Sequence, residues 1–338
     1  NIEKQKVDEI INIFHESKRP VIIAGRGVRL AGANNLLDEF CNRYHIPVVT
    51  PYLGIDNINH SKKYYIGKTG IKGDRAANFA MQNSDLILSI GSSLHVSVTG
   101  YEYKKFAKKA RKIVIDIDEK SHFKKTIEID KFFKCDAYNF LKLLNLNFYE
   151  KENNKYSSWR QNCTDWKKKY PVCLPDYDIQ DNPINIYKFI DRLSELSEED
   201  DIFIADAGSA IYAISQGIKL KKSGQRYIPS SAMATMGYSL PAAIGAGLIA
   251  KNRVFSITGD GSLQQNIQEL QTLKHYNIPV KLFILNNNGY LSIRASQKNY
   301  FSERYIGEGL NSGVSFPDTL KICKAYGIAF SRVKSLKK

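Results

Sequence analysis

The chain has 338 residues, a hydrophobic fraction of 43% and a formal net charge of +15 at pH 7. This length is sufficient for two domains with hydrophobic cores, and the hydrophobic fraction is that of an ordinary globular protein. No apolar stretch approaches the length of a membrane-spanning helix and the first residues do not resemble a signal peptide, so we expect a cytoplasmic protein with no membrane partner.

Apolar runs in the first part of the chain predict β-strands separated by helices. We expect strands at residues 20–25, 46–50, 84–91 and 112–118, and a helix at residues 34–44. Strands that alternate with helices indicate a parallel sheet covered on both faces. Residues 1–150 are therefore predicted to form a doubly wound, Rossmann-like α/β domain.

A short glycine-rich turn, Gly25-Arg26-Gly27, follows the first predicted strand. Dinucleotide-binding domains carry a GxGxxG turn at this place, but here Leu30 occupies the position of the third glycine. As evidence for a bound dinucleotide, this motif is weak.

The densest basic cluster lies at residues 103–112, and a basic chain can be a nucleic-acid binder. At helical spacing Phe106 and Ala110 fall on one face and four lysines on the other, which predicts a solvent-exposed amphipathic helix. Lysine is also abundant throughout the chain, so the charge is spread and not focused. We therefore expect no nucleic-acid partner.

Residues 151–183 differ in composition from the segments on either side, with a polar run followed by three prolines. Within this region Trp159, Cys163, Trp166 and Tyr170 recur every three or four residues, which predicts one helix packed between the domains. We expect residues 151–183 to be a linker with a helix, and residues 184–338 to be a second domain. The five cysteines and six histidines show no spacing typical of a disulfide framework or a zinc site.

Two polar motifs in the second domain each follow a predicted buried strand, at residues 254–258 and 281–285. The motifs are Gly259-Asp260-Gly261-Ser262 and Asn286-Asn287-Asn288-Gly289. The carboxyl ends of parallel strands are where open α/β sheets bind ligands. Carboxylate and amide oxygens suit Mg²⁺, which takes its other ligands from phosphate and water. With a helix expected from residue 263 to about 275, the pattern predicts a diphosphate held through a divalent cation.

This pattern resembles the cofactor motif of thiamine-diphosphate-dependent enzymes, and the surrounding sequence resembles their acetolactate synthase-like branch. Residues 206–209, after the apolar run 201–205, resemble the other diphosphate-contacting loop of the family. Residues 234–245 resemble its second cofactor segment. The resemblance implies two doubly wound parallel-sheet domains, a central domain and a domain that binds thiamine diphosphate.

The resemblance also implies the site residues. Asp260, Asn287 and the backbone carbonyl of Gly289 are expected to bind Mg²⁺. Met236 is expected to be the catalytically important apolar residue that props the cofactor in its bent shape. The backbones of Ala234 and Met236 are expected to bind the pyrimidine ring. The other expected cofactor contacts are Asp206, Gly208, Ser209, Gly259, Gly261, Ser262 and Tyr290.

The implied activity is decarboxylation or carboligation of pyruvate or another 2-keto acid, dependent on thiamine diphosphate and Mg²⁺. Residues 290–297 lack the tryptophan-containing sequence of biosynthetic acetolactate synthases and look more like relatives among surface-sugar biosynthesis enzymes. The alternative is a non-catalytic cofactor-binding or regulatory paralogue, which would lack the family's activating glutamate.

That glutamate lies in an amino-terminal pyrimidine-binding domain, whereas this chain begins in what resembles the central domain. Residues 328–333 are predicted to form a strand, after which the family continues with a further helix and strand. We therefore expect a fragment that catalyses little by itself. The family further implies a homodimer or homotetramer with the active site between subunits.

Some members of the family bind FAD in the central domain. Gly25, Gly27 and Asp116 would fit a flavin nucleotide, whereas Ser93 and Ser97 stand where flavin-binding members carry arginines. Whether FAD is bound stays open.

Overall fold

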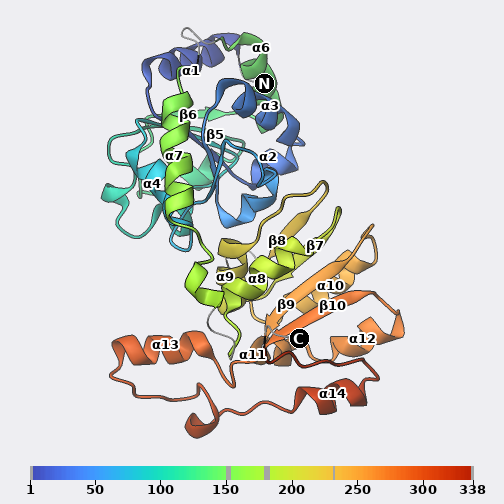
Figure 1. Cartoon of the computed structure of the whole chain (residues 1–338). Helices are drawn as coiled ribbons and strands as arrows, with labels where there is room; N and C mark the ends of the chain where they lie inside the picture. Colours follow the sequence, from blue (N-terminus) through green and yellow to red (C-terminus); the bar gives the residue numbers. More distant parts are fainter. Residues whose placement is uncertain (1–2, 150–153, 179–182, 231–232, 336–338) are drawn as a thin grey trace. The chain divides into compact units, whose positions relative to one another are not determined.

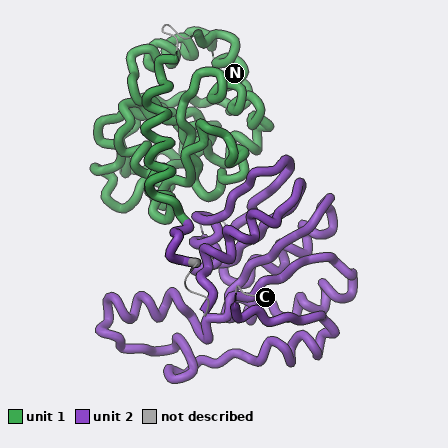
Figure 2. Tube along the Cα trace, in the orientation of Figure 1, with its two compact units in different colours: residues 1–172 green, residues 173–338 purple. Residues whose placement is uncertain are grey.

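The structure, a computed structural model, describes residues 3–149, 154–178, 183–230 and 233–335. The chain divides into two compact units, residues 1–172 and 173–338 (Figure 2). Each unit contains one parallel β-sheet with helices packed against it (Figure 1). The predicted fold class of two α/β domains with parallel sheets is therefore confirmed.

Unit 1 has a six-stranded sheet in the order β3-β2-β1-β4-β5-β6, with every neighbouring pair parallel. Its strands are β1 (Pro20–Ala24), β2 (Val48–Thr50), β3 (Tyr65–Lys68), β4 (Leu86–Ile90), β5 (Arg111–Asp116) and β6 (Lys131–Lys134). Its α-helices are α1 (Lys4–Glu16), α2 (Arg26–Leu30), α3 (Asn34–Tyr44), α4 (Arg75–Asn83), α5 (Val96–Thr99), α6 (Ala137–Asn147) and α7 (Ser157–Lys169).

Both faces of this sheet are covered, which explains why its central strands are continuous apolar runs. Successive side chains of a strand point to opposite faces. In β1, Ile22 joins the cluster formed with α1, α3 and α6, whereas Val21 and Ile23 join the cluster formed with α4 and α7.

Helix α7 is the helix that the sequence predicts between the domains, and it packs within unit 1. The Trp159 side chain is buried, and its indole Nε1 donates a hydrogen bond to the Pro20 carbonyl at 3.0 Å. Trp166 makes an edge contact with Phe79 of α4. Both tryptophans of the chain, Trp159 and Trp166, therefore report on unit 1.

The glycine-rich turn after β1 makes a close backbone crossing with the end of β4. The Gly27 N–H donates to the Gly91 carbonyl at 2.9 Å, and the Gly25 N–H donates to the Ile90 carbonyl at 2.9 Å. A Cβ atom on Gly25 would lie 2.1 Å from the Gly91 oxygen. Glycine is required at position 25 because two backbone segments are in contact there. This packing explains the glycine without any bound ligand.

We expect Gly25→Ala to lower the free energy of unfolding of unit 1 by about 3 kcal/mol or more, because the added Cβ meets backbone that cannot rotate away. Denaturant unfolding measures this, followed by tryptophan fluorescence for unit 1 and by far-ultraviolet circular dichroism for the control substitution in unit 2. Gly245→Ala is the control, since a Cβ there meets no atom within 4 Å in helix α10 (Ser239–Gly247). It should stabilise its helix by about 0.5–1 kcal/mol. Equal effects of the two substitutions would contradict the crossing.

Unit 2 has a four-stranded parallel sheet in the order β10-β9-β7-β8. The strands are β7 (Ile202–Ala205), β8 (Arg226–Pro229), β9 (Val254–Gly259) and β10 (Val280–Leu285). Besides α10, its α-helices are α8 (Ile186–Glu195), α9 (Ser209–Gly217), α11 (Asp260–Leu263), α12 (Glu269–His275), α13 (Leu291–Tyr300) and α14 (Thr319–Ala325).

Aromatic and aliphatic side chains divide between the two faces of this sheet. On one face Phe203, Phe255 and Phe283 form a row across β7, β9 and β10, and Phe189 of α8 packs on its end. On the other face α10 and α12 pack through an aliphatic cluster that includes Leu240, Ile244, Leu270, Leu282 and Ile284. This packing fixes where the carboxyl ends of the strands lie.

The expected helix over residues 263–275 differs in the structure. The helical turn already begins at Asp260, and it is broken into α11, a 3-10 turn at Gln264–Asn266, and α12. The break lies where the Asn266 side chain donates its Nδ2–H to the Gly237 carbonyl at 2.9 Å. This contact ties the break to the turn before α10.

The amphipathic helix predicted in the basic cluster is wrong. Tyr103–Lys105 form one 3-10 turn, and Ala107 then takes a left-handed conformation with φ +39°. The Ala107 N–H donates to the Gln82 side chain at 2.9 Å, so it cannot extend a helix. Phe106 and Ala110 are nevertheless buried, as their spacing indicated.

The strand predicted at residues 328–333 is also wrong for the part of the chain that the structure describes. These residues follow α14 without regular structure. The Ile328 N–H donates to the Cys323 carbonyl at 2.8 Å and so terminates the helix. The Ile328 side chain packs on the aliphatic cluster of α10 and α12.

Candidate cofactor-binding site

The two polar motifs of unit 2 meet because their strands are neighbours. Strands β9 and β10 pair in parallel, with Thr258 opposite Ile284 and Gly259 opposite Leu285. The chain leaves β9 at Gly259 and starts α11 at Asp260, while the asparagine run leaves β10 at the same edge. The residues predicted to bind a cation are therefore adjacent in space.

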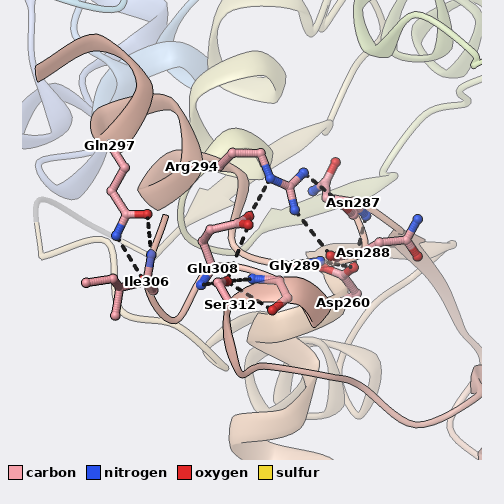
Figure 3. A network of polar contacts seen from close by, with 10 residues as sticks. Asp260, Asn287, Asn288, Gly289, Arg294, Gln297, Ile306, Glu308 and Ser312 are labelled. Atoms are coloured by element: carbon pink, nitrogen blue, oxygen red, sulfur yellow. Dashed lines mark hydrogen bonds and ion pairs between the residues drawn. The ribbon is translucent and has the colours of Figure 1, made fainter. Parts of the chain in front are cut away.

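The Asp260 carboxylate is the centre of this arrangement (Figure 3). Its Oδ2 accepts hydrogen bonds from the Asn287 N–H at 2.9 Å and the Gly289 N–H at 3.3 Å. Its Oδ1 accepts from the Gly261 N–H at 2.9 Å. The side chain is 7% exposed. The structure thus brings together the three residues predicted to bind the cation, through the Asp260 carboxylate and the backbone N–H groups of Asn287 and Gly289, and it shows that Asp260 also shapes the loop beside it.

The glycine at position 261 packs against an aromatic side chain. A Cβ atom there would lie 2.4 Å from Cε1 of Tyr290, whose ring makes an edge contact with Phe316 at 5.4 Å between centroids. Tyr290 therefore packs directly on the Gly261 backbone. At Gly259, by contrast, an added Cβ meets no atom within 4 Å, and Ser262 is buried in the first turn.

Asp206, at the end of β7, joins three segments of unit 2. Its Oδ1 accepts from the Ala207 N–H at 2.7 Å and the Gly237 N–H at 3.0 Å. Its Oδ2 accepts from the Ser239 N–H at 3.0 Å and the Thr258 hydroxyl at 3.2 Å. Because Asp206 is fully buried, its carboxylate faces protein donors on both sides. Asp206 therefore holds the surrounding loops together through these hydrogen bonds.

The rest of the residue 206–209 loop lies beside helix α13. Gly208 has φ +62° and ψ −135°, and Ser209 begins α9 directly after it. A Cβ atom on Gly208 would lie 3.3 Å from the Ser292 Oγ, in the first turn of α13. The residue 206–209 loop and the first turn of α13 are therefore neighbours.

The second cofactor segment forms a tight turn before α10. Ala234 has φ +49° and Gly237 has φ +78°. Met236, between them, is 36% exposed, so it is not a core methionine. A Cβ atom on Gly237 would lie 2.6 Å from the Gln265 Cβ, so the turn packs against the break between α11 and α12.

Sequence reasoning missed one part of this region, the contact of Arg294 with Glu308 and with the asparagine run (Figure 3). Arg294 could have been noticed, since it stands one helical turn after Tyr290. Glu308 carries no sequence signal, because only the folded loop brings it next to Arg294.

In unit 1, the residues considered for a flavin nucleotide have protein partners. The Gly27 N–H is bonded to Gly91, as described above. Asp116 lies beside His122, with 3.6 Å between Oδ2 and Nε2. The Ser93 carbonyl accepts from Lys124 Nζ at 2.5 Å. These contacts point to no further residue that could bind a flavin, and whether FAD is bound stays open.

Two general properties concern the described residues only. Their helices are all too short or too polar to cross a bilayer. No group of three or more His, Cys, Asp or Glu side chains among them is placed to hold a metal. A cation at Asp260 would therefore depend on amide, backbone and ligand oxygens.

Comparison with known proteins gives the same two-part division. Residues 7–144 match the family model of the thiamine pyrophosphate enzyme central domain, and residues 206–338 match that of the thiamine pyrophosphate enzyme C-terminal TPP binding domain.

Three relatives are each named acetolactate synthase large subunit. Those of Cyanidium caldarium and Porphyra purpurea are both 30% identical, over 98% and 97% of the chain. That of Lactococcus lactis subsp. lactis is 32% identical over 96% of the chain. The chain spans 56%, 55% and 55% of the length of these relatives, respectively. The chain therefore belongs to the thiamine pyrophosphate enzymes, and it contains the central domain and the C-terminal TPP-binding domain of that family.

Proposed function

We propose that the protein containing this chain uses thiamine diphosphate and Mg²⁺ to decarboxylate a 2-keto acid or join it to an acceptor. The observation that carries the proposal is the convergence of Asp260, Asn287 and Gly289 at the paired ends of β9 and β10. The names of the relatives support pyruvate as the 2-keto acid. A sugar-derived acceptor, a cytoplasmic location and a homodimer or homotetramer belong to the same proposal.

The residues at this edge fit a hard divalent cation. A carboxylate has about four lone-pair positions, and the backbone hydrogen bonds to Asp260 use one at Oδ1 and two at Oδ2. One position at Oδ1 can therefore serve a cation. The Asn287 side-chain oxygen and the Gly289 carbonyl are neutral oxygens of the kind that Mg²⁺ accepts beside phosphate and water.

The residues around Gly208 and Ser209 fit a diphosphate. Ser209 begins α9, so its N–H and those of the next residues have no partner within the helix and can donate to phosphate oxygens. The Ser262 hydroxyl is a further donor that we assign to the diphosphate. When bound, thiamine diphosphate supplies the electron sink for loss of carbon dioxide from the 2-keto acid.

A titration tests the proposal. We expect the full-length protein to bind thiamine diphosphate in calorimetry with Mg²⁺ present and to lose measurable binding in excess EDTA. Release of carbon dioxide from pyruvate by the loaded protein would support catalysis. Cofactor affinity that is unchanged by EDTA would overturn the cation site.

Met236 provides a separate prediction about shape. Because the side chain is partly exposed beside the turn at Gly237, we propose that it supports the bent cofactor. Met236→Leu keeps volume and apolar character and should keep most of the turnover. Met236→Ala should lower turnover on the order of a hundredfold, because small misplacements at a reacting centre are costly. Its diphosphate affinity should change little.

Steady-state turnover and cofactor titration of both variants measure these effects. Equal turnover of Met236→Ala and the wild-type protein would show that the side chain has no role in positioning the cofactor.

A further inference from the structure

The guanidinium of Arg294 spans the asparagine run and the loop after α13 (Figure 3). Its Nη1 donates to the Asn287 carbonyl at 3.3 Å, and its Nη2 donates to the Asn288 carbonyl at 3.2 Å. Its Nε forms an ion pair with the Glu308 carboxylate. One planar group thus makes three directed contacts, and two of them hold backbone carbonyls of the proposed cation loop.

Glu308 is itself held firmly in place. It is 8% exposed, and its carbonyl accepts from the Tyr290 N–H at 2.7 Å. Gly289 and Gly309 form an isolated antiparallel bridge directly beside it. The Ser312 hydroxyl accepts from the Glu308 N–H at 2.9 Å. The carboxylate that faces Arg294 therefore stands on a fixed backbone.

The loop between these groups has a backbone conformation that needs external support. Asn288 has φ +51° and Gly289 has φ +143°, two consecutive residues outside the region that side chains favour. Asp260 holds the N–H groups of Asn287 and Gly289 from one side. Arg294 holds the carbonyls of Asn287 and Asn288 from the other. Such a loop keeps its shape only while both sets of contacts persist.

We propose that Arg294, paired with Glu308, is a positioning residue that preforms the Asn286–Tyr290 loop for a divalent cation. The inference rests on the proposed function. Arginine suits the role because its rigid fork can reach two carbonyls while Nε faces a carboxylate, which a lysine ammonium cannot do. Glu308 neutralises the guanidinium, so that a positive charge next to the cation does not oppose its binding.

The test compares Arg294→Met, Arg294→Lys and Glu308→Gln in the full-length protein. The control is Lys298→Met, which removes the exposed ion pair between Lys298 of the same helix and Glu303, which follows the helix. Two quantities are measured: amide hydrogen exchange at Asn287 and Gly289 without metal, and the Mg²⁺ concentration that gives half-maximal thiamine diphosphate binding.

We expect Arg294→Met to speed exchange at both amides about tenfold or more, since the carbonyl contacts no longer hold the loop. Its half-maximal Mg²⁺ concentration should rise roughly 10–100-fold, the range typical for groups that orient metal ligands. Cofactor affinity at saturating Mg²⁺ should return close to that of the wild type. Arg294→Lys should resemble Arg294→Met. Glu308→Gln should raise the Mg²⁺ requirement, and Lys298→Met should change neither quantity.

The outcomes separate this inference from the function on which it rests. Unchanged exchange and an unchanged Mg²⁺ requirement in Arg294→Met, with Mg²⁺-dependent binding intact in the wild type, would overturn the inference alone. A full rescue by Arg294→Lys would also overturn it, because charge and not the fork would then matter. Failure of the wild-type protein to bind thiamine diphosphate with Mg²⁺ would overturn the proposed function and the inference together.

Discussion

Asp260→Ala is expected to abolish Mg²⁺-dependent binding of thiamine diphosphate. The substitution removes the anionic group at the proposed cation site and leaves the Asn287 and Gly289 N–H groups without their acceptor. Both effects weaken binding, because the diphosphate charge loses compensation and the loop loses its shape. We expect an affinity loss of at least about a hundredfold, which corresponds to about 2.8 kcal/mol. Calorimetric titration of the cofactor with Mg²⁺ measures it.

Asp260→Asn separates the two effects. The amide oxygen can still accept a backbone N–H, so the loop should stay closer to its native shape, while the negative charge is gone. We expect Asp260→Asn to unfold at nearly the wild-type denaturant concentration and still to bind thiamine diphosphate weakly. Wild-type Mg²⁺ dependence in this variant would sink the assignment of Asp260 as a cation ligand.

The sequence predicted the central strands well and the edge strands poorly. The inner strands β1, β4, β5 and β9 appear as apolar runs because protein covers most of their residues at least partly. The edge strand β10 is an exception, since its apolar run was found although none of its residues is fully buried. The strands that were missed, β3, β6 and β8, include residues such as Gly67, Lys131 and Pro229. Edge strands tolerate such residues because one side of each has no neighbour to bond.

The candidate site divides in a similar way. The motifs placed Asp260, Asn287 and Gly289 correctly at one sheet edge, because parallel strands deliver their carboxyl ends to the same place. Which groups hold these residues could not be predicted. Glu308 reaches Arg294 only through the loop after α13, and Asp206 reaches Gly237 and Ser239 only after three turns have met. Such contacts depend on tertiary structure, and no local pattern encodes them.

Asp206→Ala is expected to cause the largest loss of stability in unit 2. It leaves three buried backbone N–H groups without their acceptor, and it removes one of the two acceptors of the Thr258 hydroxyl, which also faces the Gly259 carbonyl at 3.3 Å. An unsatisfied buried donor costs about 1–3 kcal/mol, but relaxation and shared partners reduce the sum. We expect the free energy of unfolding of unit 2 to fall by about 3–5 kcal/mol, because several hydrogen bonds to one charged group are lost together. Far-ultraviolet circular dichroism during denaturant unfolding measures the change.

Two internal comparisons make this test specific. Tryptophan fluorescence follows unit 1, because Trp159 and Trp166 both lie on α7, so its transition should stay in place in Asp206→Ala. Thr258→Val removes one of the four donors together with its need for an acceptor, so it should cost only about 1 kcal/mol. If Asp206→Ala cost no more than Thr258→Val, the carboxylate would not be joining the three segments. Asp206 would then be better explained as a direct contact of the cofactor, as the sequence alone suggested.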